Sequence, residues 1–85
     1  MSTRTESEID DAMLAKMRPM VLAKRARLVA GLSQTEFART YGIPLGTLRD
    51  WEQGRSVPDA AGLAYLTAIV NDSEAVARAY GATAA

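Results

Sequence analysis

Residues 32–54 read LSQTEFARTYGIPLGTLRDWEQG, and this stretch decides the fold. Ser33 and Glu36 have the spacing of a capping box, in which each side chain bonds the backbone N–H of the other residue where a helix begins. That helix is expected to end at Gly42, because glycine takes the left-handed conformation that closes a helix at little cost. A second helix should open at Ile43-Pro44 and end at Gly54. The stretch therefore predicts two short helices around one tight turn.

The same residues meet the other demands of a helix-turn-helix, in which two helices cross steeply through a turn of three or four residues. A small residue is needed where the second helix crosses the first, and Ala38 stands there. Apolar side chains must anchor the pair to the rest of the core, and the candidates are Phe37, Tyr41, Ile43, Leu48 and Trp51. Because these demands are met together and in order, residues 34–53 are interpreted as a helix-turn-helix.

The flanking sequence is also helical in character. No period-2 alternation of apolar residues is present, and strong helix formers are abundant, so the class is all-α. Pro19 is expected in the first turn of a helix that ends near Ala30, with an apolar stripe of Val21, Leu22, Arg25, Leu28 and Val29. Pro58-Asp59 should begin a longer helix, and residues 71–73 should break it and cap a final short helix. Together these helices predict a compact five-helix bundle.

The N-terminal segment allows two interpretations. Thr5 and Glu8 again spell a capping box, and Ile9, Met13, Leu14 and Met17 follow at helical spacing. An extra short amphipathic helix and a frayed terminus both fit this pattern. The resulting division is an acidic N-terminal segment over 1–18, a helix-turn-helix domain over 19–80 and a flexible tail over 81–85.

Composition excludes several classes of function. The 85 residues include no Cys and no His, so a disulfide framework, a cysteine zinc site and the commonest general base are all missing. No nucleophile–base pair can be assembled, so the chain is expected not to be an enzyme and to need no metal or cofactor. No apolar run spans a membrane and no secretory signal is recognised, so a cytoplasmic protein is expected.

The net charge of zero hides a division along the chain. Residues 1–15 carry one arginine against four carboxylates, and residues 56–85 carry one arginine against three. Residues 16–55 carry eight basic side chains against three acidic ones, and this block contains the helix-turn-helix. A phosphate backbone would be attracted to the middle of the chain and a basic protein to its ends. Ordinary solvated helix faces are the alternative.

The motifs of residues 31–54 resemble those of a known protein family. The chain resembles the Cro/C1-type (Xre) DNA-binding domain at several positions. These are residues 31–34 and 36–38, Gly42-Ile43, Thr47-Leu48 and the Trp51-Glu52-x-Gly54 group. The resemblance covers roughly residues 19–70 and implies a bundle of the lambda-repressor-like type. Within this family, the sequence of residues 42–59 most resembles that of Xre-type antitoxins of type II toxin–antitoxin systems, HigA-like or BrnT-associated. Such antitoxins bind a RelE-fold ribonuclease toxin and repress their shared operon.

The resemblance implies roles for particular residues. Arg27 and Glu52 would form a structural pair that joins the second helix of the motif to the helix that precedes the motif. The second helix of the motif would lie in the major groove of a palindromic operator, read by a homodimer. The residues implied in DNA binding are Gln34, Thr35, Arg39, Pro44, Leu45, Gly46, Thr47, Arg49, Asp50 and Arg55.

Each of these DNA contacts has a plainer alternative. Arg49 is the best candidate for a base contact, since arginine commonly bonds guanine through two hydrogen bonds, yet an exposed arginine is often only solvated. Asp50 could accept from cytosine but would also repel the phosphate backbone. Pro44-Leu45-Gly46 departs from the polar residues common in the family at these positions. Leu45 offers only contact with a thymine methyl group, and Gly46 offers only close approach.

The acidic residues Glu6, Glu8, Asp10 and Asp11 are a candidate contact for a small basic ribonuclease toxin. A solvated acidic helix face is the alternative, and a metal site has little support without His or Cys. Two other functions remain open: a solitary regulator without a toxin, and a protein-interaction bundle that does not bind DNA.

Overall fold

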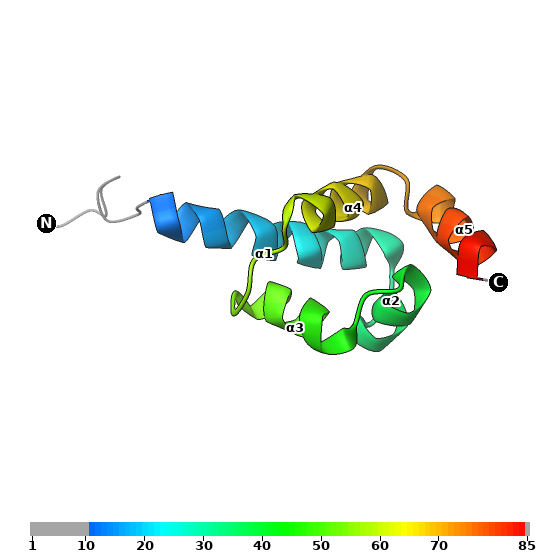
Figure 1. Ribbon diagram of the computed structural model, residues 1–85, viewed down its shortest axis with the longest axis horizontal. Helices are drawn as coiled ribbons and strands as arrows, with labels where there is room; N and C mark the ends of the chain where they lie inside the picture. The colour runs from blue at the N-terminus through cyan, green and yellow to red at the C-terminus, as the bar shows by residue number, and fades with distance from the viewer. Residues whose placement is uncertain (1–10, 85) are drawn as a thin grey trace, which may run out of the picture.

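The computed structural model describes residues 11–84, and all regular structure in this range is helical. The five helices are α1 (Asp11–Ala30), α2 (Gln34–Tyr41), α3 (Leu45–Gln53), α4 (Ala60–Asn71) and α5 (Ser73–Ala84). Figure 1 shows α1 as the long central helix, with α3 and α4 packed along it and α2 and α5 near its C-terminal end. The predicted all-α five-helix bundle is therefore confirmed. Residues 1–10, which carry most of the acidic segment and its capping box, lie outside the described residues.

The first helix begins earlier than the sequence predicts. Pro19 was expected in a first turn, but α1 starts at Asp11 and continues through Pro19. Proline removes a backbone hydrogen bond inside a helix and disfavours helical geometry in the residue before it. Here the preceding residues are strong helix formers and the proline itself is buried, so propensity and packing outweigh the local penalty.

The buried face of α1 is also not the one predicted. Ala23 and Ala26 are completely buried, with Leu22 and Ala30 packed beside them. Most of the expected stripe is instead exposed, namely Val21, Arg25, Leu28 and Val29. Because α1 packs against both α3 and α4, the alanine face allows a close approach of the helix backbones that larger side chains would prevent.

The largest fully buried side chains of the core are Phe37, Leu48, Leu66 and Ile69. Three further residues of the predicted helix-turn-helix are buried with them, namely Ala38, Tyr41 and Ile43. Trp51, predicted to be core, is half-buried and packs against this cluster. The helix-turn-helix therefore contributes most of its apolar side chains to the common core, as the sequence predicted.

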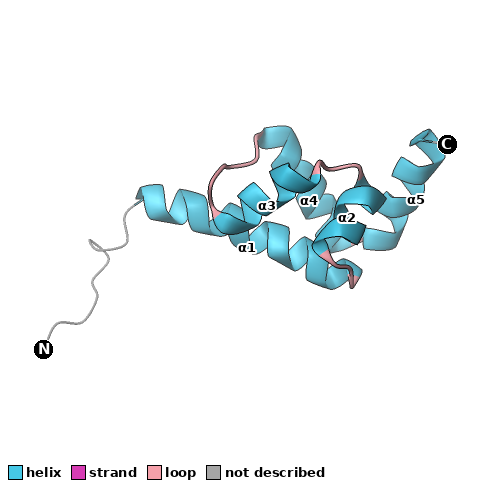
Figure 2. Cartoon of the chain, turned by 90° about the horizontal axis from the view of Figure 1, so that it is seen from below, coloured by secondary structure: helices cyan, strands magenta, loops and turns pink. Residues whose placement is uncertain are grey.

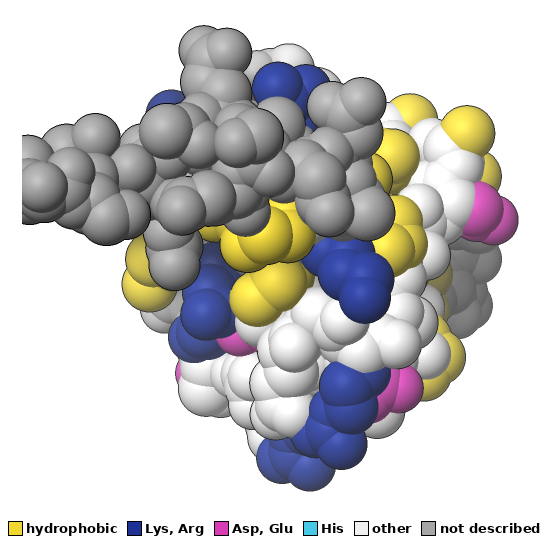
Figure 3. Space-filling model, turned by 90° about the vertical axis from the view of Figure 1, so that its left-hand side faces the viewer, with side chains coloured by type: hydrophobic (Ala, Val, Ile, Leu, Met, Phe, Trp, Pro, Cys, Tyr) yellow, Lys and Arg dark blue, Asp and Glu magenta, His cyan; other side chains and the backbone are white. Residues whose placement is uncertain are grey.

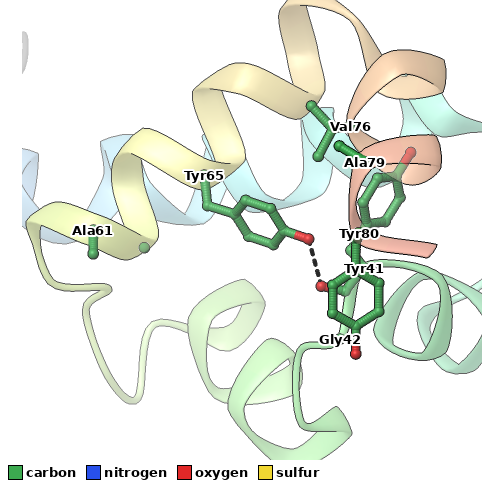
Figure 4. Close-up of a pocket in the computed structure, with 8 residues that line it drawn as sticks. Tyr41, Gly42, Ala61, Tyr65, Val76, Ala79 and Tyr80 are labelled. Atoms are coloured by element: carbon green, nitrogen blue, oxygen red, sulfur yellow. Dashed lines mark hydrogen bonds between the residues drawn. The ribbon is translucent and has the colours of Figure 1, made fainter. Parts of the chain in front are cut away.

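Tyrosines connect the end of α2 to α4 and α5. The Tyr65 hydroxyl donates to the Tyr41 carbonyl at 2.6 Å, and the Tyr41 hydroxyl donates to the Ser73 carbonyl at 2.9 Å. Figure 4 shows the first of these bonds in a shallow apolar hollow of about 660 Å³, with Tyr80 beside Gly42. These contacts hold the turn between α2 and α3 against the C-terminal helices.

The last two helices begin where the sequence predicted. Asp59 caps α4 by accepting from the Gly62 N–H at 2.8 Å, and Asp72 accepts from the Ala75 N–H at 3.1 Å at the start of α5. The end of α5 differs, because the helix continues through Gly81 to Ala84, where a flexible tail was expected. None of the helices between Asp11 and Ala84 is both long and apolar enough to cross a membrane.

The turn glycine provides a test of this packing. Gly42 has φ +69°, and a Cβ added there would lie 2.3 Å from the Tyr80 ring. Gly46 lies inside α3 with open space around it. We expect Gly42→Ala to lower the free energy of unfolding by roughly 1–2 kcal/mol, because alanine is strained at positive φ. The matched change Gly46→Ala should stabilise by about 0.5–1 kcal/mol, because alanine is the better helix former.

Thermal unfolding followed by circular dichroism measures both variants. A loss of about 1 kcal/mol corresponds to a fall of roughly 4–8 °C in the melting temperature of a domain of this size. Equal melting temperatures for the two variants would contradict the assigned role of Gly42.

Candidate nucleic-acid interface

The start of α2 has the geometry that its sequence predicts. The Ser33 hydroxyl accepts from the Glu36 N–H at 3.2 Å, and the Ser33 N–H donates to the Glu36 carboxylate at 3.1 Å. The bond from the Ser33 backbone lowers the pKa of Glu36, with the Ser33 side chain acting in the same direction. At the other end of α2, the Ile43 N–H reaches the Ala38 carbonyl at 2.9 Å across the left-handed Gly42. The two helices of the motif are therefore set by local bonds.

The outer face of α3 is defined by burial. Leu48 and Glu52 point into the protein, whereas Gly46, Arg49 and Gln53 are exposed. The exposed residues follow a spacing of three and four, so they lie on one side of the helix. Thr47 and Asp50 are half-exposed beside them. This face is the part of α3 that could enter a groove.

A buried carboxylate lies directly beneath that face. Glu52 is only 3% exposed, and its carboxylate accepts from Arg27 Nε at 2.9 Å and from a second Arg27 nitrogen at 3.1 Å. The pair implied by the family resemblance is therefore present. The hydrogen bond to Glu52 raises the pKa of Arg27, and partial burial opposes that effect. A carboxylate at this depth requires such a partner, because an unpaired buried charge is strongly unfavourable.

Gln34 connects this pair to the outer face. Its amide nitrogen donates to the Glu52 carboxylate at 3.2 Å, and its amide oxygen accepts from Arg49 Nε at 3.4 Å. Two of the candidate DNA-binding residues, one on α2 and one on α3, are thus held against each other. A side chain positioned in this way loses less conformational freedom when it makes a further contact.

Arg55 and Asp50 also interact. Their side chains form an ion pair at 3.6 Å on the surface, and Arg55 bonds the Gln53 side chain. From its position on α3, Asp50 could repel a phosphate backbone. In the structure its charge is partly balanced by the neighbouring arginine.

The remaining candidates are distributed around this face. Thr35 and Arg39 are exposed on α2, and Pro44 is exposed at the N-cap of α3. Leu45 differs from its expected position, because it is half-buried and packs against the core. Its side chain is therefore less available for a thymine methyl group than the sequence suggested. Gln53 was not among the candidates, although its position four residues after Arg49 could have indicated it.

The basic block is divided by the fold. Five of its eight basic residues lie on α1, and four of these are exposed: Lys16, Arg18, Lys24 and Arg25. The helix-turn-helix and the turn after it hold Arg39, Arg49 and Arg55. Figure 3, which views the molecule from the N-terminal end of α1, shows Lys and Arg side chains at its lower end, on the side of α3. Among the described residues, no group of three or more His, Cys, Asp or Glu side chains could hold a metal ion.

The comparison with known families agrees with this geometry. Residues 24–61 match the family model described as Helix-turn-helix, which spans the end of α1, all of α2 and α3, and the start of α4. This part of the chain is therefore similar to helix-turn-helix domains, a class that serves DNA-binding transcription regulators. The Cro/C1-type resemblance is thereby supported at this level. No curated protein and no solved structure gives a significant match to the chain.

The buried pair leads to a prediction about stability. Glu52→Gln removes the charge that balances Arg27, and we expect it to lower the free energy of unfolding by roughly 1–3 kcal/mol, since Arg27 keeps some solvent. Asp50→Asn breaks the exposed pair with Arg55 and should change stability by less than about 0.5 kcal/mol. Urea denaturation of the two variants separates them, and an equal effect at both sites would contradict the assigned role of Glu52.

Proposed function

We propose that the chain is a sequence-specific DNA-binding repressor that acts as a homodimer on a palindromic operator. The observation that carries this proposal is the bridge of Gln34 between Glu52 and Arg49, which fixes a polar side chain of α2 and a cation of α3 on one face. In the mechanism, α3 enters the major groove while α2 crosses the backbone. Two protomers occupy half-sites about one helical turn, roughly 34 Å, apart.

Within this mechanism the residues divide by the DNA group they reach. Arg49 is the principal base reader, helped by Thr47 and by Gln53, which lies on the same exposed face. Arg39 and Arg55 neutralise phosphates on either side, with Thr35 and Gln34 at the edge of the groove. Because Gly46 has open space around it, it allows the backbone of α3 to approach the bases closely. A protein with this few polar readers depends partly on DNA shape for its specificity.

The finer part of the proposal is that this repressor is the antitoxin of a type II toxin–antitoxin pair in the bacterial cytoplasm. It is supported by the resemblance of residues 42–59 and by the four carboxylates of residues 6–11, which suit a small basic ribonuclease toxin. The antitoxin would block the toxin by covering its surface, without catalysis, and would repress their shared operon. A solitary regulator and a protein-interaction bundle are the competing functions.

DNA binding can be tested with fluorescence anisotropy on a duplex from upstream of the gene. Arg49→Ala should weaken binding to this duplex by roughly 1–3 kcal/mol and leave binding to unrelated DNA almost unchanged. Arg55→Ala should weaken binding to both duplexes alike. If Arg39 and Arg55 of two protomers contact phosphates, the slope of log K against log salt should be about −4 and should fall to about −2 in Arg55→Ala.

The matched control is Arg78→Ala, which removes an exposed arginine of α5 outside the helix-turn-helix. It should leave affinity and slope unchanged. Binding that is insensitive to salt and to Arg49→Ala would overturn the DNA-binding function and leave the interaction bundle.

The antitoxin role predicts that the chain co-purifies with the product of the adjacent gene. Reversing the four charges at Glu6, Glu8, Asp10 and Asp11 to lysine should abolish this association, because a basic partner would then be repelled. Glu74→Lys, which reverses an exposed charge on α5, should leave the association intact. Association that survives the fourfold reversal would contradict the acidic contact, and the absence of any partner would favour the solitary regulator.

A further inference from the structure

The outer side of α1 carries apolar residues that the core does not use. Met17, Val21 and Leu28 are 46%, 61% and 70% exposed. They follow one another at intervals of four and seven residues, so they lie along one side of the helix. The buried Ala23 and Ala26 lie on the opposite side, against the rest of the protein. The exposed apolar residues are therefore open to a partner.

A groove with an arginine at each end lies in this surface. It has a volume of about 370 Å³ and is lined by Met17, Arg18, Val21, Leu22 and Arg25, all of which belong to α1. Met17, Val21 and Arg25 lie at intervals of four residues and form one row of side chains. Arg18 and Leu22 form the row beside it. A groove between two such rows is the feature into which a second helix packs a ridge of its own side chains.

The charge of the groove favours an acidic partner. Arg18 and Arg25 are both exposed, and among residues 11–84 neither of them forms an ion pair. They are seven residues apart, so their Cα atoms are separated by about 10 Å along the axis of α1. A helix with two carboxylates at this separation and apolar side chains between them would pair both arginines and cover Val21. Figure 3 shows hydrophobic side chains between groups of Lys and Arg side chains at this end of the molecule.

The start of the groove is accessible. Figures 1 and 2, which are two views at right angles, both show the first turns of α1 extending beyond α3 and α4. The groove also shares no residue with the exposed face of α3, which consists of Gly46, Arg49 and Gln53. It is therefore a surface separate from the candidate DNA interface.

We infer that this groove binds an amphipathic helix of a different, acidic protein, in which two carboxylates about two turns apart flank apolar side chains. A second copy of the chain does not match this pattern, because no helix between Asp11 and Ala84 carries two carboxylates seven residues apart. A basic protein such as the proposed toxin would be repelled by the arginines. A phosphate backbone would pair with the arginines but would leave the apolar side chains between them without apolar contacts.

Fluorescence anisotropy of the full chain with a labelled synthetic peptide tests this groove. The probe is an alanine-based helix of about 18 residues, with two glutamates seven residues apart and leucines between them on the same side. A control peptide carries glutamines in place of the two glutamates. The glutamate peptide should bind in the micromolar range, because one helix pair is a small interface, and the control peptide should bind at least about tenfold more weakly. Equal binding of the two peptides would overturn the proposal.

Variants of the chain test the residues of the groove. Arg18→Glu with Arg25→Glu should abolish binding of the glutamate peptide and create binding of a third peptide that carries lysines at those two positions. Val21→Ser should also weaken binding of the glutamate peptide, because it removes an apolar contact at the centre of the groove. Lys16→Glu is the matched control, since Lys16 is an exposed cation of α1 that does not line the groove, and it should leave binding nearly unchanged. Circular dichroism should show that all these variants are folded.

Two results with these variants would overturn the inference. One is a double reversal of Arg18 and Arg25 that still binds the glutamate peptide or fails to bind the lysine peptide. The other is an equal loss of binding in Lys16→Glu and in the double reversal, which would indicate attraction by the general charge of α1.

Two further measurements identify any other occupant of the groove. Binding of the chain to phosphatidylglycerol vesicles that is lost in the double reversal, without binding of the glutamate peptide, would replace the protein partner by a membrane surface and overturn the inference. Self-association in sedimentation equilibrium that is lost in the double reversal would make a second copy the occupant and overturn it as well. Because no DNA is present in any of these measurements, such a result would leave the proposed repressor function intact.

Discussion

The buried carboxylate of Glu52 is the constraint on which the arrangement of the first three helices depends. A charge that is 3% exposed must be balanced within the protein, and Arg27 of α1 provides that balance. This requirement fixes how α3 lies along α1. Gln34 then satisfies another position of the same carboxylate and brings the start of α2 to the same point. One charged group thereby sets the relative placement of the two helices that form the candidate interface.

The alanine face of α1 is the apolar counterpart of this constraint. Close packing of α3 and α4 on one helix leaves space only for small side chains at positions 23 and 26. Several large apolar residues of α1 consequently lie on its outer side and outside the core, namely Met17, Val21, Leu28 and Val29.

The parts of the fold that could be predicted from sequence are those held by interactions over a few residues. The capping box of Ser33 and Glu36, the left-handed Gly42 and the Asp59 cap all depend on bonds within one turn, and all are present. The buried face of α1 could not be predicted in this way, because it depends on how closely α3 and α4 pack against α1. Leu45, expected to face the groove, is half-buried and packs against the core. The pairing of Arg27 with Glu52 spans 25 residues and was expected only through the family resemblance.

The unusual Pro44-Leu45-Gly46 segment acquires a physical interpretation from this geometry. Pro44 fixes the backbone where α3 begins, Leu45 turns partly into the core, and Gly46 leaves an open surface. None of the three side chains can form a hydrogen bond with a base edge. In the proposed complex, the first turn of α3 therefore contributes only a close approach of its backbone to the DNA. Arg49 and Gln53 lie on the following turns and are held by Gln34 and Arg55. In the proposed complex, direct base recognition would fall on residues that the protein orients before it binds DNA, and this would reduce the conformational entropy lost on binding.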